Sequence, residues 1–203
     1  MQRPVEQRQA PKHRTSARRH PHEQTLGFTS RQWPFIYVLV GNWLFAAAVF
    51  VLAKLLWDWV PSEWTIGDRI ALVIKNAVVA ILPAVVAICI VAGQRLDPSM
   101  FVGRVPKPNS AVDINNRFIL NTVEQFILYF IGNAGLALYC PAQEARSLIV
   151  LTALFVLGRM LFWVGYHYNP YVRAFGFGIT FYPTVIVYLW LILRMFFGIE
   201  IRI

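Results

Sequence analysis

The sequence predicts an all-α integral membrane protein with five transmembrane helices. Of its 203 residues, 57% are hydrophobic and only 14% are charged. Five apolar runs each approach the ~20 residues that a helix needs to cross the hydrocarbon core of a bilayer. The charges between these runs alternate, as expected for a chain that crosses a membrane repeatedly. A soluble domain of this length would need more polar surface, so the soluble classes are excluded.

Residues 1–31 form the one long hydrophilic segment of the chain. Their acidic residues are Glu6 and Glu23 alone, whereas basic residues, histidines and prolines are frequent. This composition cannot bury enough apolar surface to fold, so it predicts a disordered cytoplasmic tail. Topogenic charge accounts for the basic residues more simply than nucleic-acid binding does, and no nucleic-acid partner is expected. The basic residues are Arg3, Arg8, Lys12, Arg14, Arg18, Arg19 and Arg31.

The five apolar runs follow this tail, and each is expected to form one membrane-spanning helix. The first is bounded by Trp33 and Trp57, and tryptophan is typical of membrane interfaces. Pro83 lies inside the second run and Pro183 inside the fifth, which transmembrane helices tolerate. The runs cover residues 34–57, 70–93, 118–139, 147–168 and 174–197.

The charges of the connecting segments predict the orientation of the chain. The segment after the first run carries Asp58, Glu63 and Asp68 against Arg69, whereas the tail and the segment 94–116 are basic. The segment between the third and fourth runs is neutral, and the segment between the fourth and fifth runs is basic. Because Lys and Arg favour the cytoplasmic side, the N-terminus is expected in the cytoplasm and the C-terminus outside. A bacterial inner membrane and a eukaryotic endomembrane both remain open.

Polar residues on the third and fourth runs are the candidate functional residues. Arg117, Asn121 and Glu124 are spaced i, i+4 and i+7, which places them on one face of a helix. Arg159 and Tyr166 are seven residues apart and also share a face. Charged groups are costly in hydrocarbon, so such residues usually face a cavity or a partner. The predicted orientation brings both faces to the cytoplasmic side.

Arg173 lies just beyond these two faces and adds another guanidinium. Together the residues offer cations, a carboxylate, an amide and a phenol, which suit a small polar ligand that carries both charges. An ion pair between Arg159 and Glu124 is the structural alternative, because it would join two helices without any ligand. Neither cysteines, histidines nor carboxylates have metal-ligand spacing, so no metal is predicted.

The string Arg117-Phe-Ile-Leu-Asn121-Thr-Val-Glu124, followed by Gly158-Arg159 and Gly165-Tyr166, resembles the MAPEG superfamily. This superfamily comprises membrane-associated proteins of eicosanoid and glutathione metabolism. The resemblance covers residues 70–197 and implies a four-helix transmembrane bundle that forms a homotrimer. The helix at 34–57 is an addition to that bundle, as in the mattrin-like branch of the superfamily.

The resemblance also implies a ligand, which is glutathione bound between adjacent subunits near the cytoplasmic side. Arg117, Asn121 and Glu124 would hold the polar ends of the tripeptide, with Glu124 on its amine. Arg159 and Tyr166 would complete the pocket. The ligand's two carboxylates and ammonium match a set of fixed cations with one anion.

Arg173 occupies the position of a family arginine that stabilises the glutathione thiolate, so it is the candidate catalytic residue. A cation is needed there because an ordinary thiol titrates near ~8.5 and is largely protonated at neutral pH. Phe162 and Gln125 stand where some members carry tyrosines, and Ala174 stands where some carry a hydroxyl. Glutathione binding is therefore better supported than any particular eicosanoid reaction.

Three classes of function remain at this point. The favoured one is a glutathione transferase or peroxidase that acts on a lipophilic small molecule reaching the site from the bilayer. The alternative is a non-catalytic trimeric membrane protein, structural or regulatory, that keeps the polar pocket. A small transporter is the third, but a conduction path would need polar residues across the whole membrane. The expected partners are a second and third copy of the chain, membrane lipid and the lipophilic substrate.

Overall fold

Five α-helices make up the fold in the computed structural model, which describes residues 33–56, 63–96 and 105–198. The tail predicted at 1–31 lies outside these described residues. Every regular element in the described ranges is helical, as the sequence predicts. The helices are α1 (Trp33–Leu56), α2 (Ile66–Gln94), α3 (Ala111–Tyr139), α4 (Arg146–Tyr168) and α5 (Pro170–Phe197), and a short 3-10 turn, η2 (Ala142–Glu144), precedes α4.

Four of these helices, α1, α2, α4 and α5, are long and apolar enough to cross a membrane. The protein is therefore an integral, multi-pass membrane protein. The helix α3 has 29 residues, ample length to span, but it is less apolar than these four helices. The reason is its polar first half, which carries the candidate residues Arg117, Asn121 and Glu124.

The helices α2, α3 and α5 begin several residues before the apolar runs do. Thr65 caps α2 in a reciprocal arrangement with Asp68, whose backbone N–H donates to the threonine hydroxyl. The hydroxyl of Ser110 accepts from the backbone N–H of Asp113 at the start of α3, and Asn169 caps α5 directly before Pro170. Such capping residues satisfy the first free N–H groups of a helix. The apolar run thus marks the part of the helix that meets lipid, and the cap marks its start.

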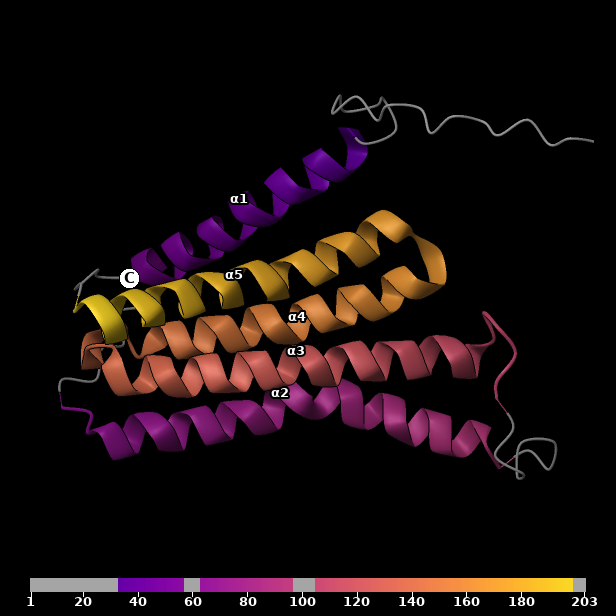
Figure 1. Ribbon diagram of the computed structural model, residues 1–203, viewed down its shortest axis with the longest axis horizontal. Helices are drawn as coiled ribbons and strands as arrows, with labels where there is room; N and C mark the ends of the chain where they lie inside the picture. The colour runs from indigo at the N-terminus through magenta and orange to yellow at the C-terminus, as the bar shows by residue number, and fades with distance from the viewer. Residues whose placement is uncertain (1–32, 57–62, 97–104, 199–203) are drawn as a thin grey trace, which may run out of the picture.

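The helices α2 to α5 lie side by side and alternate in direction, whereas α1 crosses beside α5 at an angle (Figure 1). The most extensive contact joins α4 to α5. One end of the bundle holds the end of α4 and the start of α5, and is here named the Tyr168 end. The other holds the end of α3 and the start of α4, and is named the Cys140 end. The helix α2 bends near its middle (Figure 1), and it contains Pro83, which cannot donate a helical hydrogen bond.

Glycines allow α4 and α5 to pack with their backbones in contact. A Cβ added to Gly165 would lie 2.2 Å from the backbone nitrogen of Arg173. A Cβ on Gly176 would lie 2.4 Å from the backbone nitrogen of Phe162. No side chain fits at such distances, so both positions require glycine. This contact fixes the candidate residues of α4 against those of α5.

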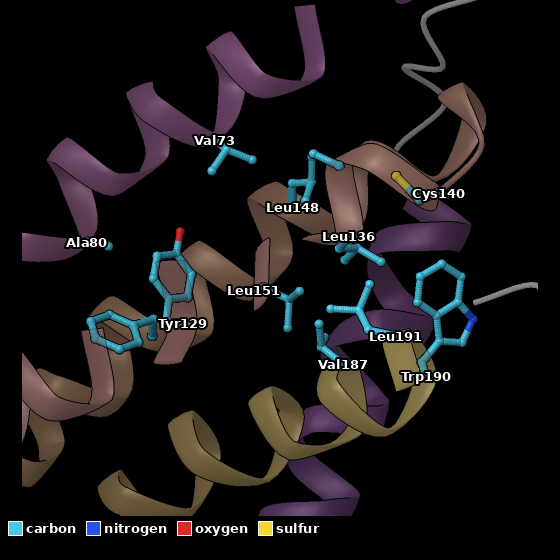
Figure 2. Close-up of a cluster of buried hydrophobic side chains, with 12 residues drawn as sticks. Val73, Ala80, Tyr129, Leu136, Cys140, Leu148, Leu151, Val187, Trp190 and Leu191 are labelled. Atoms are coloured by element: carbon cyan, nitrogen blue, oxygen red, sulfur yellow. The ribbon is translucent and has the colours of Figure 1, made fainter. Parts of the chain in front are cut away.

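The main hydrophobic core lies between α2, α3, α4 and α5 towards the Cys140 end (Figure 2). Tyr129 of α3 lies among these apolar side chains, and its hydroxyl shares a 2.7 Å hydrogen bond with Thr152 of α4. At the edge of this core, the guanidinium of Arg69 donates to the carbonyl of Cys140. The Tyr129 hydroxyl is thus satisfied inside an apolar environment, whereas Nε of Arg69 has no acceptor among the described residues.

The helix α1 docks on α5 chiefly through side chains. The amide of Asn42 fills the space left by Gly178, where an added Cβ would lie 1.9 Å from Nδ2. Trp43 stacks on Tyr182 with ring centroids 5.3 Å apart. Asn42 is 3% exposed, and its Oδ1 accepts no hydrogen bond in the described part of the chain.

Candidate functional site

Arg159 is the centre of the candidate site and is completely buried. Its guanidinium donates to Oδ1 of Asn121 at 2.8 Å and to the hydroxyl of Thr180. These bonds join α4 to α3 on one side and to α5 on the other. Thr180 also donates to the carbonyl of Phe177 at 2.8 Å, which fixes its hydroxyl for the arginine. The residue therefore connects three helices.

The charge of Arg159 is not balanced by any carboxylate in the described residues. The ring of Phe162 lies 4.6 Å from the guanidinium carbon and that of Phe155 lies 5.8 Å away. Cation–π contacts compensate part of the lost hydration, but less than a counter-ion would. The Nε–H has no acceptor in the described chain. A buried cation with a free donor is a natural place for an anionic ligand group.

Phe162 links this centre to a second pair of candidate residues at the Tyr168 end. Its ring meets the ring of Tyr166 edge-on, with centroids 4.9 Å apart. The guanidinium of Arg173 lies over the ring of Tyr166, and its carbon is 5.0 Å from the ring centroid. Arg173 is exposed, so it can reach a ligand outside the helix pair. The structure thus brings Arg159, Tyr166 and Arg173 into one series along the α4–α5 contact.

Arg117 and Glu124 are placed differently from Asn121, although all three share one helix face. Arg117 is exposed and pairs with Asp113 at 2.7 Å, one turn earlier on α3. Glu124 is also exposed, and within the described residues it forms neither an ion pair nor a hydrogen bond. The ion pair between Arg159 and Glu124 that the sequence allowed is therefore not formed. Asn121, a neutral acceptor, takes its place.

A polar contact holds the start of α3 against α4 beside these residues. The indole N–H of Trp163 donates to Oδ1 of Asn115 at 2.9 Å. The amide nitrogen of Asn115 donates in turn to Gln94 at the end of α2, at 3.4 Å. The ring of Phe118 stacks on Trp163 with centroids 4.8 Å apart. These residues position the α3 face that carries Arg117 and Asn121.

Thr180 is the residue of this polar centre that reasoning from the sequence missed. It lies seven residues after Arg173 and therefore on the same face of α5, so its spacing carried the signal. Thr122 and Gln125, buried on α3 beside the site, are two further polar groups. Their acceptor oxygens have no donor within the part of the chain that the structure describes.

The fold and this site define a multi-pass helical membrane protein with a buried polar centre shared by three helices. The MAPEG family matches residues 71–193, which include α3, α4 and most of α2 and α5. The chain belongs to the MAPEG family. The resemblance inferred from the two polar faces is thereby confirmed, and α1 lies outside the matched region.

Two relatives are similar to the chain over 136 residues. Transmembrane protein 79 of Bos taurus is 31% identical, and Transmembrane protein 79 of Mus musculus is 30% identical. The match covers 67% of this chain in both cases. It covers 34% of each relative, so the chain spans about a third of their length. These relatives represent the mattrin-like branch that the additional helix indicated. No solved structure gives a significant match.

Proposed function

We propose that the protein binds glutathione at the centre formed by Arg159 and at the polar residues beside it. The observation that carries the proposal is the buried guanidinium of Arg159, which has neither a carboxylate partner nor an acceptor for its Nε–H among the described residues. A carboxylate of the ligand would supply the missing counter-charge. Charge-assisted hydrogen bonds of this kind are short and strong away from bulk water.

The exposed residues fit the remaining groups of glutathione. Glu124 would accept from the ligand's ammonium, and Arg117 would bind its second carboxylate in exchange for Asp113. Both side chains project from the bundle and not into it. A second copy of the chain packed on this face would enclose the ligand and shield these charges from lipid. The proposed assembly is a homotrimer, with the Tyr168 end on the cytoplasmic side.

The reaction that suits this site is nucleophilic attack of the glutathione thiolate on a lipophilic electrophile. Arg173 would stabilise the thiolate, and the sulfur would form a bond to an electrophilic carbon of the substrate. The bond between that carbon and its leaving atom would break, and its electron pair would pass to the leaving atom, which takes a proton from water. Tyr166, whose ring the Arg173 guanidinium covers at 5.0 Å, would hold that guanidinium in place.

Glutathione titrations on detergent-purified protein test the proposal. Glu124→Ala should weaken binding at least about tenfold, because the ligand's ammonium loses its counter-charge. Glu63→Ala is the matched control, since Glu63 is exposed near the Cys140 end, and it should bind like the parent. Equal affinity of the parent, Glu124→Ala and Arg159→Met for glutathione would rule out this pocket.

Arg173→Ala separates catalysis from binding. The variant should keep most of the affinity but should show a higher thiol pKa, measured by thiolate absorbance, and a lower turnover at neutral pH. Arg194→Ala, near the other end of α5, is the control for loss of one arginine. A parent that binds glutathione without lowering the pKa of its thiol would be a binding protein and not a transferase.

A non-catalytic role is the second candidate, and one observation favours it. Arg159 already bonds to Asn121 and Thr180, so it stabilises the bundle without any ligand. In this case the polar centre would serve to fix the helices in register. Glutathione would then leave the thermal unfolding midpoint of the protein unchanged, whereas a bound ligand raises it.

A further inference from the structure

A row of buried polar side chains follows α3 on the face that meets α2 and α4. Its members are separated by seven, three, four and four residues, which keeps them on one side of the helix. Each is at most 6% exposed. At 1.5 Å per residue the row extends ~27 Å, close to the ~30 Å hydrocarbon core of a bilayer. This row, here named the polar stripe, consists of Asn115, Thr122, Gln125, Tyr129 and Asn133.

Three oxygens of the polar stripe have no donor within the described part of the chain. They are Oγ1 of Thr122, Oε1 of Gln125 and Oδ1 of Asn133. The amide nitrogen of Asn133, in contrast, donates to the carbonyl of Tyr129 at 3.0 Å. Buried acceptors nearly always receive a hydrogen bond, either from the protein or from ordered water. Inside a membrane this requirement is stricter, because bulk solvent cannot replace a missing donor.

Tyr129 adds a fourth open acceptor, because of the direction of its hydrogen bond. The hydroxyl of Thr152 donates to the carbonyl of Leu148 at 2.6 Å. The 2.7 Å contact between the two hydroxyls therefore uses the proton of Tyr129. The lone pairs of the Tyr129 oxygen remain open to another donor. Figure 2 shows this oxygen pointing towards the ribbon of α2.

The helix α2 faces the polar stripe with alanines, which offer no side-chain donor and little volume. The asparagine that begins the stripe donates to Gln94 at the end of α2, at 3.4 Å, which sets the register of these antiparallel helices. Counted from that bond, the middle of the stripe is level with three buried alanines, each at most 1% exposed. These alanines are Ala80, Ala84 and Ala87. The open acceptors on α3 thus face methyl groups.

Pro83 adds an open acceptor on α2 at the same level. It has no N–H, so the carbonyl of Val79, four residues earlier, loses its usual helical donor. The proline is buried and lies next to Ala84, on the inner side of α2. Ordered water is one of the means by which membrane helices satisfy carbonyls that a proline has freed.

These groups define the chemistry of what lies between the helices. It must donate hydrogen bonds, because the open groups are acceptors. It must be neutral, because none of the five residues of the stripe is a carboxylate that could balance a cation in hydrocarbon. It must be small, because the side chains around it are almost completely buried. Water meets all three conditions.

We propose that ordered water molecules bind along the polar stripe, between α3 and the alanines of α2. Thr122 and Gln125 are one turn apart on the same face, so one water molecule bridges them. A second bridges Tyr129 and Asn133, which are also one turn apart. Asn133 lies ~12 Å beyond Gln125 along the helix, so the two waters occupy separate positions. The sites are independent of the glutathione proposal, because no residue of the stripe takes part in it.

A crystal structure of the full chain grown in a lipid mesophase, at a resolution that shows ordered water, tests the proposal directly. Water should lie at hydrogen-bonding distance from Oε1 of Gln125 and from Oδ1 of Asn133. In Ala84→Leu the longer side chain should displace the first water, whereas the second should stay as the internal control. The proposal is overturned if both oxygens are dry, or if the leucine variant keeps the first water.

Thermal unfolding in detergent distinguishes a hydrated stripe from a dry one by the sign of the effect, even where Ala84→Leu fails to fold. Thr122→Val removes the hydroxyl but keeps the shape of the side chain. If water is bound there, it loses a partner, and the midpoint should fall by about 2–4 °C. On a dry stripe the same change removes an unmatched buried acceptor, so the midpoint would rise.

Thr184→Val is the matched control for this measurement. The hydroxyl of Thr184 is also buried, but it donates to the carbonyl of Thr180 in its own helix at 2.8 Å. Its removal should lower the midpoint less than Thr122→Val does. An unchanged or higher midpoint of Thr122→Val relative to the parent overturns the proposal.

Discussion

Two contacts of the same helix differ in kind: α5 meets α4 backbone to backbone, but it meets α1 through side chains. At Gly165 and Gly176 the α4–α5 contact leaves no room even for a methyl group. At Gly178 it is a side chain, the amide of Asn42, that enters the space beside the glycine. A cavity of about 410 Å³ remains along the rest of the α1 contact.

This difference separates a rigid contact from one that can adapt. The polar centre at Arg159 lies on the rigid contact, so its donors are fixed before any ligand arrives. Such pre-organisation is what binding and catalysis of a charged ligand require. The α1 contact has side chains that can shift and a cavity that another molecule can fill.

Gly165→Ala should have the largest effect, because its Cβ would overlap the backbone of Arg173 at 2.2 Å. The loss of stability should exceed about 3 kcal/mol, the upper end for overpacking. Gly93→Ala should not meet any neighbour, since nothing lies within 4 Å of a Cβ added at this position. It should stabilise α2 by about 0.5–1 kcal/mol. Thermal unfolding in detergent measures both, and equal midpoints would contradict the rigid contact.

Arg159 is the next most sensitive position on the rigid side. Arg159→Ala should lower stability by about 2–3 kcal/mol, because it leaves a cavity and deprives Asn121 and Thr180 of their donor. Arg159→Met restores the volume without the charge and should recover most of that stability. Thermal unfolding midpoints measure the stability of the two variants, and glutathione titrations measure their affinity for the ligand. A methionine variant as unstable as the alanine one would show that the charge itself supports the fold.

Gly178→Ala should perturb only the adaptable contact. Its Cβ would meet Nδ2 of Asn42 at 1.9 Å, and a side chain can move where a backbone cannot. The expected loss is about 1–2 kcal/mol, and a second change, Asn42→Ala, should recover part of it. Cross-linking of Phe45→Cys with Phe175→Cys by a bifunctional maleimide reports whether α1 stays docked, because the two native rings are in edge contact, 5.7 Å between centroids. Additive losses in the double variant would contradict direct contact.

Tyr129→Phe should have the smallest effect among these changes. The variant removes the 2.7 Å bond to Thr152, but the threonine keeps its bond to the carbonyl of Leu148. A loss of about 1 kcal/mol is expected. Tyr188→Phe, which removes a more exposed bond to the carbonyl of Leu128, is the control and should lose less. A reversed order in the unfolding midpoints would contradict the assigned burial.

Much of the fold could be read from the sequence because its signals are local. Apolar runs near 20 residues predict membrane helices whatever their partners are. The helix starts at Thr65, Ser110 and Asn169 were missed for a physical reason: a polar cap lies outside the apolar run, so hydropathy alone cannot find it. Pairing within the site was also missed. Arg159 donates to Asn121 and Thr180 and not to Glu124, because the Glu124 side chain is exposed on the outside of the bundle.

The helical membrane class, the family and the residues of the polar faces follow from the amino-acid sequence alone, because they depend on composition and on spacing along single helices. The three-dimensional structure was needed to show that Arg159 is buried without a counter-charge among the described residues and that Arg173 covers Tyr166. It alone placed α1 against α5 with a cavity between them. Such features depend on how closely two helices approach, and that distance is set by glycines and side chains far apart in the chain.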